Sequence, residues 1–318
     1  MSGDVLTQGG DAARESASGH HDAPRDAAWV YHDGAFVRAG DAGFNLHERG
    51  VTFGDGVYEV VRYDGGRGFA LDRHVARMRR SLAAIEIEGV DPAELAAHSD
   101  ELLRRNDWTH AKAYWQVTRG RQPRDFVMDA KAKPTVTAWL APVEPMHAGQ
   151  NVAQGAAVWA EDIRWLRCDI KSLLLMPASL ARTRASRAGA VEALFVRDKP
   201  SSGGGVASLR HVTEGTSTNV IAVVDGALVT HPTDRYILAG VTRAVLLEHA
   251  RASGREVQER AMTPDELLAA DELLVCSTTQ VTAITSIEGA VIGEGQVGPV
   301  TQLLHGAYVA MVLAGRGV

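Results

Sequence analysis

The chain has 318 residues, with 45% hydrophobic residues, 23% charged residues and a formal net charge of -6 at pH 7. This is the composition of a soluble globular protein with room for two ordinary domains. A mildly acidic chain is not expected to bind nucleic acid or an anionic membrane surface, so the expected partner is a small molecule.

The start of the chain and its cysteines bear on where the protein works. Residues 1–26 are rich in Gly, Ala, Ser, Asp and His and lack the apolar stretch of a signal peptide, which predicts a disordered tail. No later apolar run approaches the roughly 20 residues that span a bilayer. Cys168 and Cys276 lie far apart, in no metal-ligand spacing. We therefore expect a cytoplasmic protein with neither a disulfide framework nor a metal site.

The first half of the chain predicts a small sheet with two helices. Residues 28–38 are typical of a hairpin with Asp33 and Gly34 at its turn, and residues 57–62 are typical of a strand. Asp72 is predicted to be the N-cap of a helix, and Pro92 is predicted to begin another. Two further strands are expected at residues 113–118 and 135–140.

The Pro- and Gly-containing stretch 141–150 is typical of a domain boundary. It predicts a small domain at 27–143, a linker at 144–150 and a larger domain at 151–318. In the second half, helices are expected at 173–188, at 241–253 and from Pro299, a hairpin at 219–228, and strands at 191–197, 272–277 and 282–287. The Gly-rich stretch 199–210 is typical of a flexible loop tip. The whole pattern indicates an α+β fold.

One lysine has an unusual neighbourhood. Lysine occurs at only five positions, although the chain has 33 Lys plus Arg. Lys171 follows Ile170 and precedes three leucines and a methionine, so we expect a partly desolvated amine, which favours the neutral form that imine formation requires. The alternative is a surface lysine that caps a helix or pairs with Asp169.

Three other segments carry polar groups that are ambiguous on their own. Glu214 lies in a predicted small-residue turn and is either an exposed turn residue or a carboxylate that accepts a hydrogen bond from a protonated pyridine nitrogen. Thr242 begins a predicted helix, where it serves as an N-cap or helps to bind an anion at the free backbone amides. The hydroxyls at 277–279 follow an apolar strand and meet either a phosphate or a turn.

Taken in order, the stretches 49–61, 162–172, 212–219, 237–243 and 277–279 resemble the fold type IV enzymes that use pyridoxal 5'-phosphate (PLP), the class IV aminotransferases. Among these, the chain most resembles the D-amino acid transaminases, over nearly its whole length after residue 28. The resemblance implies a smaller N-terminal α/β domain and a larger C-terminal mixed α/β pseudo-barrel domain that binds PLP.

The resemblance also implies residue roles. Lys171 carries PLP through an imine bond and moves protons, Glu214 keeps the pyridine nitrogen protonated, and Leu238 packs against the ring. The phosphate-binding set that it implies is Arg77, Val241, Thr242, Ser277 and Thr278. For Arg77 the alternative is a solvated helix face beside Arg79 and Arg80.

The implied substrate-binding residues depart from the family pattern. Tyr58, Val60 and Arg62 follow the D-amino acid transaminase strand, and the family's substrate carboxylate is also met by an Arg-x-His pair from the partner subunit of a homodimer. Here Arg124 is kept but Phe126 replaces the histidine and cannot donate a hydrogen bond, which is worth about tenfold to a hundredfold in binding.

Other neighbours add to this departure. Asp125 introduces a carboxylate that is able to pair with Arg124 or Arg121, so we expect weaker binding of α-carboxylates or their recognition by Arg121. Leu174 stands where the family usually has asparagine, and the Gly-rich insertion is longer than the usual turn. No physical consequence of either follows from the sequence.

The predicted activity is transfer of the amino group of a D-amino acid such as D-alanine to a 2-oxo acid, 2-oxoglutarate or pyruvate, by a ping-pong mechanism. An (R)-amine:pyruvate transaminase is an alternative that the apolar Phe126 favours. An aminodeoxychorismate lyase is a weaker one, because Tyr58 and Arg62 argue against it. A PLP-binding protein without catalysis is the fourth possibility, against which the retained Lys171 and Glu214 argue.

Overall fold

The structure is a computed structural model that describes residues 25–129, 131–199 and 209–315. The predictions of a disordered tail at 1–26 and of a flexible tip at 199–210 fall almost entirely outside these residues. No helix in the described part of the chain is long and apolar enough to cross a membrane.

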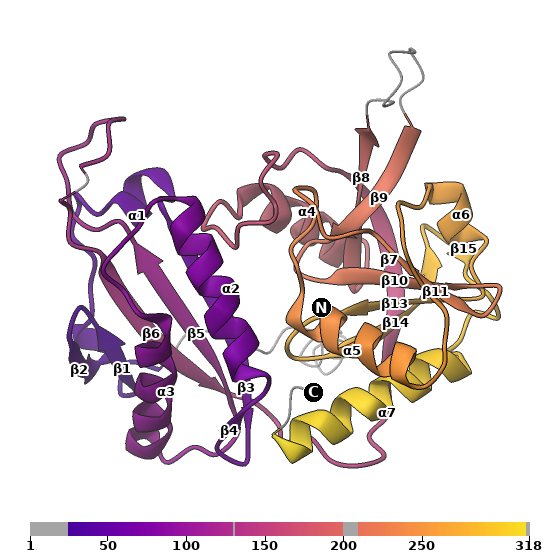
Figure 1. The fold of residues 1–318 in the computed structure, drawn as a ribbon, viewed down its shortest axis with the longest axis horizontal. Helices are drawn as coiled ribbons and strands as arrows, with labels where there is room; N and C mark the ends of the chain where they lie inside the picture. The colour runs from indigo at the N-terminus through magenta and orange to yellow at the C-terminus, as the bar shows by residue number, and fades with distance from the viewer. Residues whose placement is uncertain (1–24, 130, 200–208, 316–318) are drawn as a thin grey trace, which may run out of the picture.

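The first half forms an antiparallel sheet in the order β2-β1-β6-β5-β3-β4. Its strands are β1 (Trp29–His32), β2 (Ala35–Arg38), β3 (Gly56–Asp64), β4 (Arg67–Gly68), β5 (Ala111–Thr118) and β6 (Thr135–Pro142). The predicted hairpin is confirmed, because positive φ angles at Asp33 and Gly34 make the tight turn between β1 and β2. Two helices, α2 (Leu71–Ala84) and α3 (Pro92–Asn106), cover one face of this sheet (Figure 1).

Alternation along β3 decides which side chains those helices cover. Val57 and Val61 are fully buried in the core that α2 and α3 share with the sheet. Tyr58 and Val60 are only half-buried and belong to the opposite face, because successive side chains of a strand alternate between faces.

The predicted N-cap of α2 is wrong. The helix begins at Leu71 after Ala70, which is in the left-handed conformation with φ 48° and makes no side-chain cap hydrogen bond. Asp72 lies in the first turn instead. The physical reason is tertiary packing: Phe69 and Ala70 are buried in the core of the other half of the molecule, where the Phe69 ring contacts Tyr308 edge-to-face at 5.6 Å.

The second half forms a mixed sheet in the order β12-β11-β10-β13-β14-β7-β8-β9, with β15 paired to β14. Its strands are β7 (Ala153–Glu161), β8 (Glu192–Lys199), β9 (Leu209–Gly215), β10 (Asn219–Val224), β11 (Ala227–Thr230), β12 (Val257–Glu259), β13 (Glu272–Cys276), β14 (Val281–Ile287) and β15 (Ala290–Val291). Strand β9 lies at one end of this order and β10 lies near the other end, yet the chain connects them through residues 216–218 alone. The sheet therefore curls back on itself.

The remaining helices are α1 (Arg49–Phe53), α4 (Met176–Arg187), α5 (Val241–Ala252), α6 (Pro264–Leu268) and α7 (Pro299–Ala314), with a 3-10 turn η1 (Ala39–Asp41). Helices α5 and α7 pack together over one core of the curled sheet. The predicted helix 173–188 begins only at Met176, because Leu173 is hydrogen-bonded to β3. The strands β7 and β9 were not anticipated from the sequence. The expected α+β class is confirmed, and the stretch between β7 and α4 lies between the two sheets (Figure 1).

Candidate active site

The segment that carries Lys171 is attached to the edge of β3. Because β4 pairs only with the end of β3, residues 56–58 have a free edge. The Tyr58 amide donates to the Lys171 carbonyl (3.0 Å), and the Leu173 amide donates to the Gly56 carbonyl (3.0 Å). This pairing brings the Lys171 amine to 4.3 Å from the centre of the Tyr58 ring. Asp169, the alternative surface partner, pairs with Arg167 instead.

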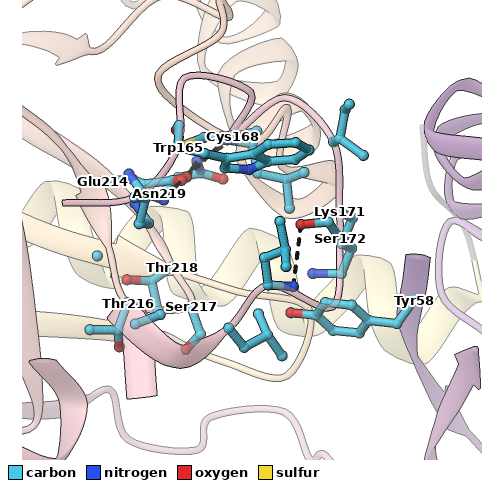
Figure 2. Close-up of a pocket in the computed structure, with 17 residues that line it drawn as sticks. Tyr58, Trp165, Cys168, Lys171, Ser172, Glu214, Thr216, Ser217, Thr218 and Asn219 are labelled. Atoms are coloured by element: carbon cyan, nitrogen blue, oxygen red, sulfur yellow. Dashed lines mark hydrogen bonds and ion pairs between the residues drawn. The ribbon is translucent and has the colours of Figure 1, made fainter. Parts of the chain in front are cut away.

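Lys171 and Glu214 line one pocket between the two sheets. Figure 2 shows Lys171 and Tyr58 on one side of this pocket and Glu214 with Asn219 on the opposite side. Four of the predicted site residues line it: Tyr58, Lys171, Glu214 and Leu238. Leu174, which departs from the family pattern, also lines it.

Glu214 is not in a turn, as the sequence suggested, but near the end of strand β9, and it is 6% exposed. Its Oε1 atom accepts from Arg164 (2.5 Å), and its Oε2 atom accepts from the Asn219 amide group (3.1 Å) and the Leu238 backbone amide (3.0 Å). Burial raises the pKa of Glu214, while Arg164 opposes that rise. The carboxylate is thus held firmly at the wall of the pocket.

Arg77 is a buried member of an ion-pair network rather than a solvated residue of α2. Its guanidinium forms a two-pronged pair with Glu59 (2.7 and 2.8 Å) and donates to the Ala239 carbonyl (3.0 Å). His74 also contacts Glu59, through Nδ1 at 2.9 Å. Burial favours a protonated Glu59, but Arg77 and His74 outweigh burial and hold its pKa far below the usual value. Burial lowers the pKa of His74.

The start of α5 has the chemistry of an anion site. Its N-cap, Gly240, makes no side-chain cap hydrogen bond, and the buried Thr242 hydroxyl has no hydrogen-bond partner in the described part of the chain. A Cβ at Gly240 would lie 1.8 Å from Asn219 Oδ1, so this close approach requires glycine. Free backbone amides with an unpaired hydroxyl at a helix start fit a phosphate group.

Of the other predicted phosphate-binding residues, Arg77 contacts the stretch before this helix start, while Ser277 and Thr278 follow strand β13. Arg77 reaches Ala239, which follows Leu238 and precedes Gly240. Ser277 follows Cys276, whose strand pairs with β10 at Asn219, and the Ser277 hydroxyl lies 3.2 Å from that of Thr279. The Thr278 carbonyl accepts from the Tyr308 hydroxyl at 2.7 Å.

The predicted substrate-binding residues are not all brought to this pocket. Val60 shares the face of Tyr58 without lining the pocket. Arg62 is buried elsewhere, where it donates to Asp64 (2.8 Å) and to the Glu144 carbonyl (2.7 Å). It therefore joins the end of β3 to the stretch that leads into the second sheet.

Arg121, Arg124 and Phe126 lie on an exposed loop after β5. Phe126 is 82% exposed, and its ring meets Phe53 edge-to-face at 5.7 Å, while the Arg124 guanidinium lies 5.4 Å from the centre of the same Phe53 ring. Arg121 has a distant contact with Asp33 at 3.8 Å. Asp125 uses its side chain to accept from the Val127 amide.

Several residues of this region were not singled out from the sequence: Glu59, Asp162, Arg164 and Asn219. Glu59 had a readable signal, because it lies between Val57 and Val61 in the register that faces the core. A carboxylate in that register requires a buried partner. Arg164 lies in the loop after β7, and Asn219 is the first residue of β10. These two places come together only when the second sheet folds.

Comparisons with known proteins give this chain a family and several relatives. The model of the amino-transferase class IV family matches residues 56–287. The chain is 39% identical to the D-alanine aminotransferase of Bacillus licheniformis, over 90% of this chain and 97% of that protein, and 38% identical to that of Listeria innocua, over 88% and 95%. Among solved structures, the branched-chain aminotransferase of the archaeon Thermoproteus uzoniensis with norvaline is 25% identical, with a TM-score of 0.75 over 91% of this chain and 95% of that one.

Proposed function

Because the chain belongs to the class IV aminotransferases, we propose that it transfers the amino group of a D-amino acid to a 2-oxo acid with bound PLP. The observation that carries the proposal is the placement of Lys171 opposite Glu214 in one pocket, beside Tyr58. D-alanine is the expected donor, because the relatives are D-alanine aminotransferases. The proposed acceptor is 2-oxoglutarate or pyruvate.

Lys171 is the proposed catalytic residue. PLP, when bound, supplies an electron sink for the charge left when the substrate α-carbon loses its proton. Lys171 would hold the cofactor covalently, and its free Nζ atom would take that proton and return it. The contact with the Tyr58 ring orients the amine toward the pocket.

The other cofactor-binding roles follow the chemistry of the groups present. Glu214 would accept a hydrogen bond from the ring nitrogen, and Leu238 would pack against the ring. The proposed phosphate site combines Arg77 with Thr242 and the free amides at the start of α5. Val241, Ser277 and Thr278 complete the set.

Substrate recognition is proposed to involve two subunits of a homodimer. The loop with Arg121, Arg124 and Phe126 projects from its own subunit, so it is suited to reach the pocket of a partner, where Tyr58 lines the wall. Large apolar side chains are exposed around this loop and at the start of α4, including Leu46, Val127 and Met176. Exposed apolar patches of this kind are typical of protein interfaces.

Two broader proposals concern organisation and location. We propose a small domain at 27–143 and a cofactor-binding domain at 151–318, joined by the linker 144–150. Cys168 and Cys276 are both free and buried, and burial raises the pKa of Cys168 to about 11. Unreactive free thiols are compatible with the proposed cytoplasmic location.

The test is a half-reaction on the holoenzyme. Adding D-alanine is expected to convert bound PLP to pyridoxamine phosphate, seen by absorption, whereas L-alanine produces little change. Absence of conversion by any D-amino acid would contradict the proposal. The same assay with (R)-phenylethylamine tests the second candidate, an (R)-amine transaminase, which the apolar Phe126 favours; that candidate requires faster conversion by the amine than by D-alanine.

A further inference from the structure

Glu214 belongs to a cluster of two carboxylates and two arginines at the wall of the pocket: Asp162, Arg164, Arg197 and Glu214. Arg164 lines the pocket and connects the two acids, since it donates to Glu214 Oε1 (2.5 Å) and pairs through Nε with Asp162 (2.8 Å). Asp162 also pairs with Arg197 (3.0 Å). The formal charges of the four groups cancel.

The position of Arg164 is fixed on several sides. Its second guanidinium nitrogen completes the fork on Asp162 (2.9 Å) and also donates to the Tyr236 carbonyl (3.2 Å). The guanidinium carbon lies 4.4 Å from the centre of the Phe195 ring. Asp162 is itself held by the Thr213 hydroxyl (3.0 Å), so its fork on Arg164 is rigid. A planar guanidinium held in this way keeps one orientation toward Glu214.

A buried carboxylate at this position needs a permanent counter-charge. Without one, burial favours the protonated acid, which donates rather than accepts a hydrogen bond. Arginine suits this purpose because it does not lose its proton in proteins. Glu214 Oε2 accepts from Asn219 and Leu238, so the two carboxylate oxygens are held by different partners and the carboxylate plane is fixed.

Under the proposed function, Glu214 and the ring nitrogen of PLP are two bases that share one proton. We propose that Arg164 is a positioning residue for this pair: held by Asp162, it keeps Glu214 ionised and oriented, so that the shared proton stays on the ring nitrogen. This inference rests on the proposed function and adds a residue that acts on the cofactor through Glu214. Asp162 acts one step further back, because its fork holds Arg164.

The test compares holoenzymes loaded with PLP that carries ¹⁵N in its ring, at one pH and without amino acid. The ¹⁵N chemical shift separates a protonated from a neutral ring nitrogen. The wild-type protein is expected to show the protonated ring, Arg164→Gln the neutral ring, and Arg164→Lys, which keeps the positive charge, the protonated ring. Arg167→Gln removes an exposed arginine of the same segment and serves as the matched control, with the wild-type shift expected.

The rate of the half-reaction with D-alanine provides a second measurement. In Arg164→Gln the rate constant at saturating substrate is expected to fall by about tenfold to a hundredfold, the usual range for a lost hydrogen bond to a charged group. Arg164→Lys is expected to recover most of it. A purely structural role would not change the ring nitrogen shift in a protein that still binds PLP.

A protonated ring in PLP-loaded Arg164→Gln, or a neutral ring in the wild type, overturns the inference. If Arg164→Gln does not retain PLP, Arg164→Lys decides, because a neutral ring there shows that a positive charge at this position is not sufficient. The shift is read without any amino acid, so a wrong substrate assignment leaves it unchanged. A wild-type chain that binds no PLP overturns both this inference and the proposed function.

Discussion

The proposed cofactor side of the site and the loop of the proposed substrate side differ in how their charged groups are paired. On the cofactor side, Arg77 and Arg164 are almost enclosed and form two-pronged pairs with buried carboxylates. On the proposed substrate side, Arg121 and Arg124 lie on an open loop, where their contacts are a 3.8 Å approach to Asp33 and an aromatic ring at 5.4 Å. The first pair of arginines is held by partners within this chain, and the second pair is open to solvent.

This difference predicts which substitutions affect stability and which affect only substrate binding. Buried, paired charges are costly to disturb, so changes on the cofactor side are expected to reduce stability and chemistry together. Exposed charges contribute little to stability, so changes on the loop are expected to alter substrate binding alone. Single substitutions on either side test this division.

The largest effect is expected for Lys171→Ala. Removing the amine removes both the covalent attachment of PLP and the proposed proton transfer, and general acid–base catalysis alone contributes about 10²–10⁴-fold. The rate constant of the D-alanine half-reaction should fall by at least that range. Lys133→Ala, which removes a lysine side chain that is 85% exposed, is the control and should react normally. Substantial turnover in Lys171→Ala would remove Lys171 from the mechanism.

Arg77→Ala tests the buried pair directly. It leaves Glu59 ionised and without its main partner in the core, and breaking such a pair costs about 3–5 kcal/mol of unfolding free energy. Urea unfolding of the protein without PLP measures this cost. Arg79→Ala, on the same helix, removes an exposed pair with Asp91 and should change the unfolding free energy little. Equal effects of the two substitutions would contradict the comparison.

The cofactor side was also the part that the sequence predicted better. Lys171, Glu214 and Leu238 do line one pocket, because local motifs carry them. The buried charge of Glu59 was visible as a break in the core register of β3, but its partner in α2 is a long-range contact. Asp162, Arg164 and Glu214 meet only when β7 and β9 join the curled sheet, and neither strand was anticipated. Long-range strand pairing leaves little local pattern to read.

The substrate side was harder to predict for a different reason. Tyr58 and Val60 lie on one face of β3, as the alternation of a strand requires, but Arg62, two residues further, donates to Asp64 and the Glu144 carbonyl. The alternation of side chains along a strand predicts the face on which a side chain begins. It does not predict which partner a long side chain contacts. The expected pairing of Asp125 with an arginine likewise gave way to a local bond to the Val127 amide.

Phe126→His tests the open loop. It restores a hydrogen-bond donor at the position where the family pattern has one, and a hydrogen bond to a charged group is worth about tenfold to a hundredfold in binding. The KM for D-alanine should decrease by about tenfold to a hundredfold. We expect kcat and the unfolding free energy to stay nearly unchanged. Val127→His, at the next exposed position, is the control. A change in stability without a change in KM would oppose the division between the two sides.

The smallest effect concerns pH and returns to the buried side. Burial lowers the pKa of His74 below the ordinary value of 6.5, so below pH 6.5 the unfolded chain binds a proton that the folded chain does not. The unfolding free energy therefore decreases as pH falls below 6.5 toward the lower pKa of His74 in the folded chain. The decrease is at most about 1.4 kcal/mol per pH unit for one proton. His74→Gln keeps a polar contact with Glu59 but does not titrate, so urea unfolding between pH 7.5 and pH 5.5 should show a shallower decline than in the wild type. His147→Gln changes an exposed ring and leaves the Glu59 network intact. If the unfolding free energy declined equally in His74→Gln and the wild type, His74 would take up its proton in the folded chain as readily as in the unfolded chain. The buried side would then be less rigid than its ion pairs indicate.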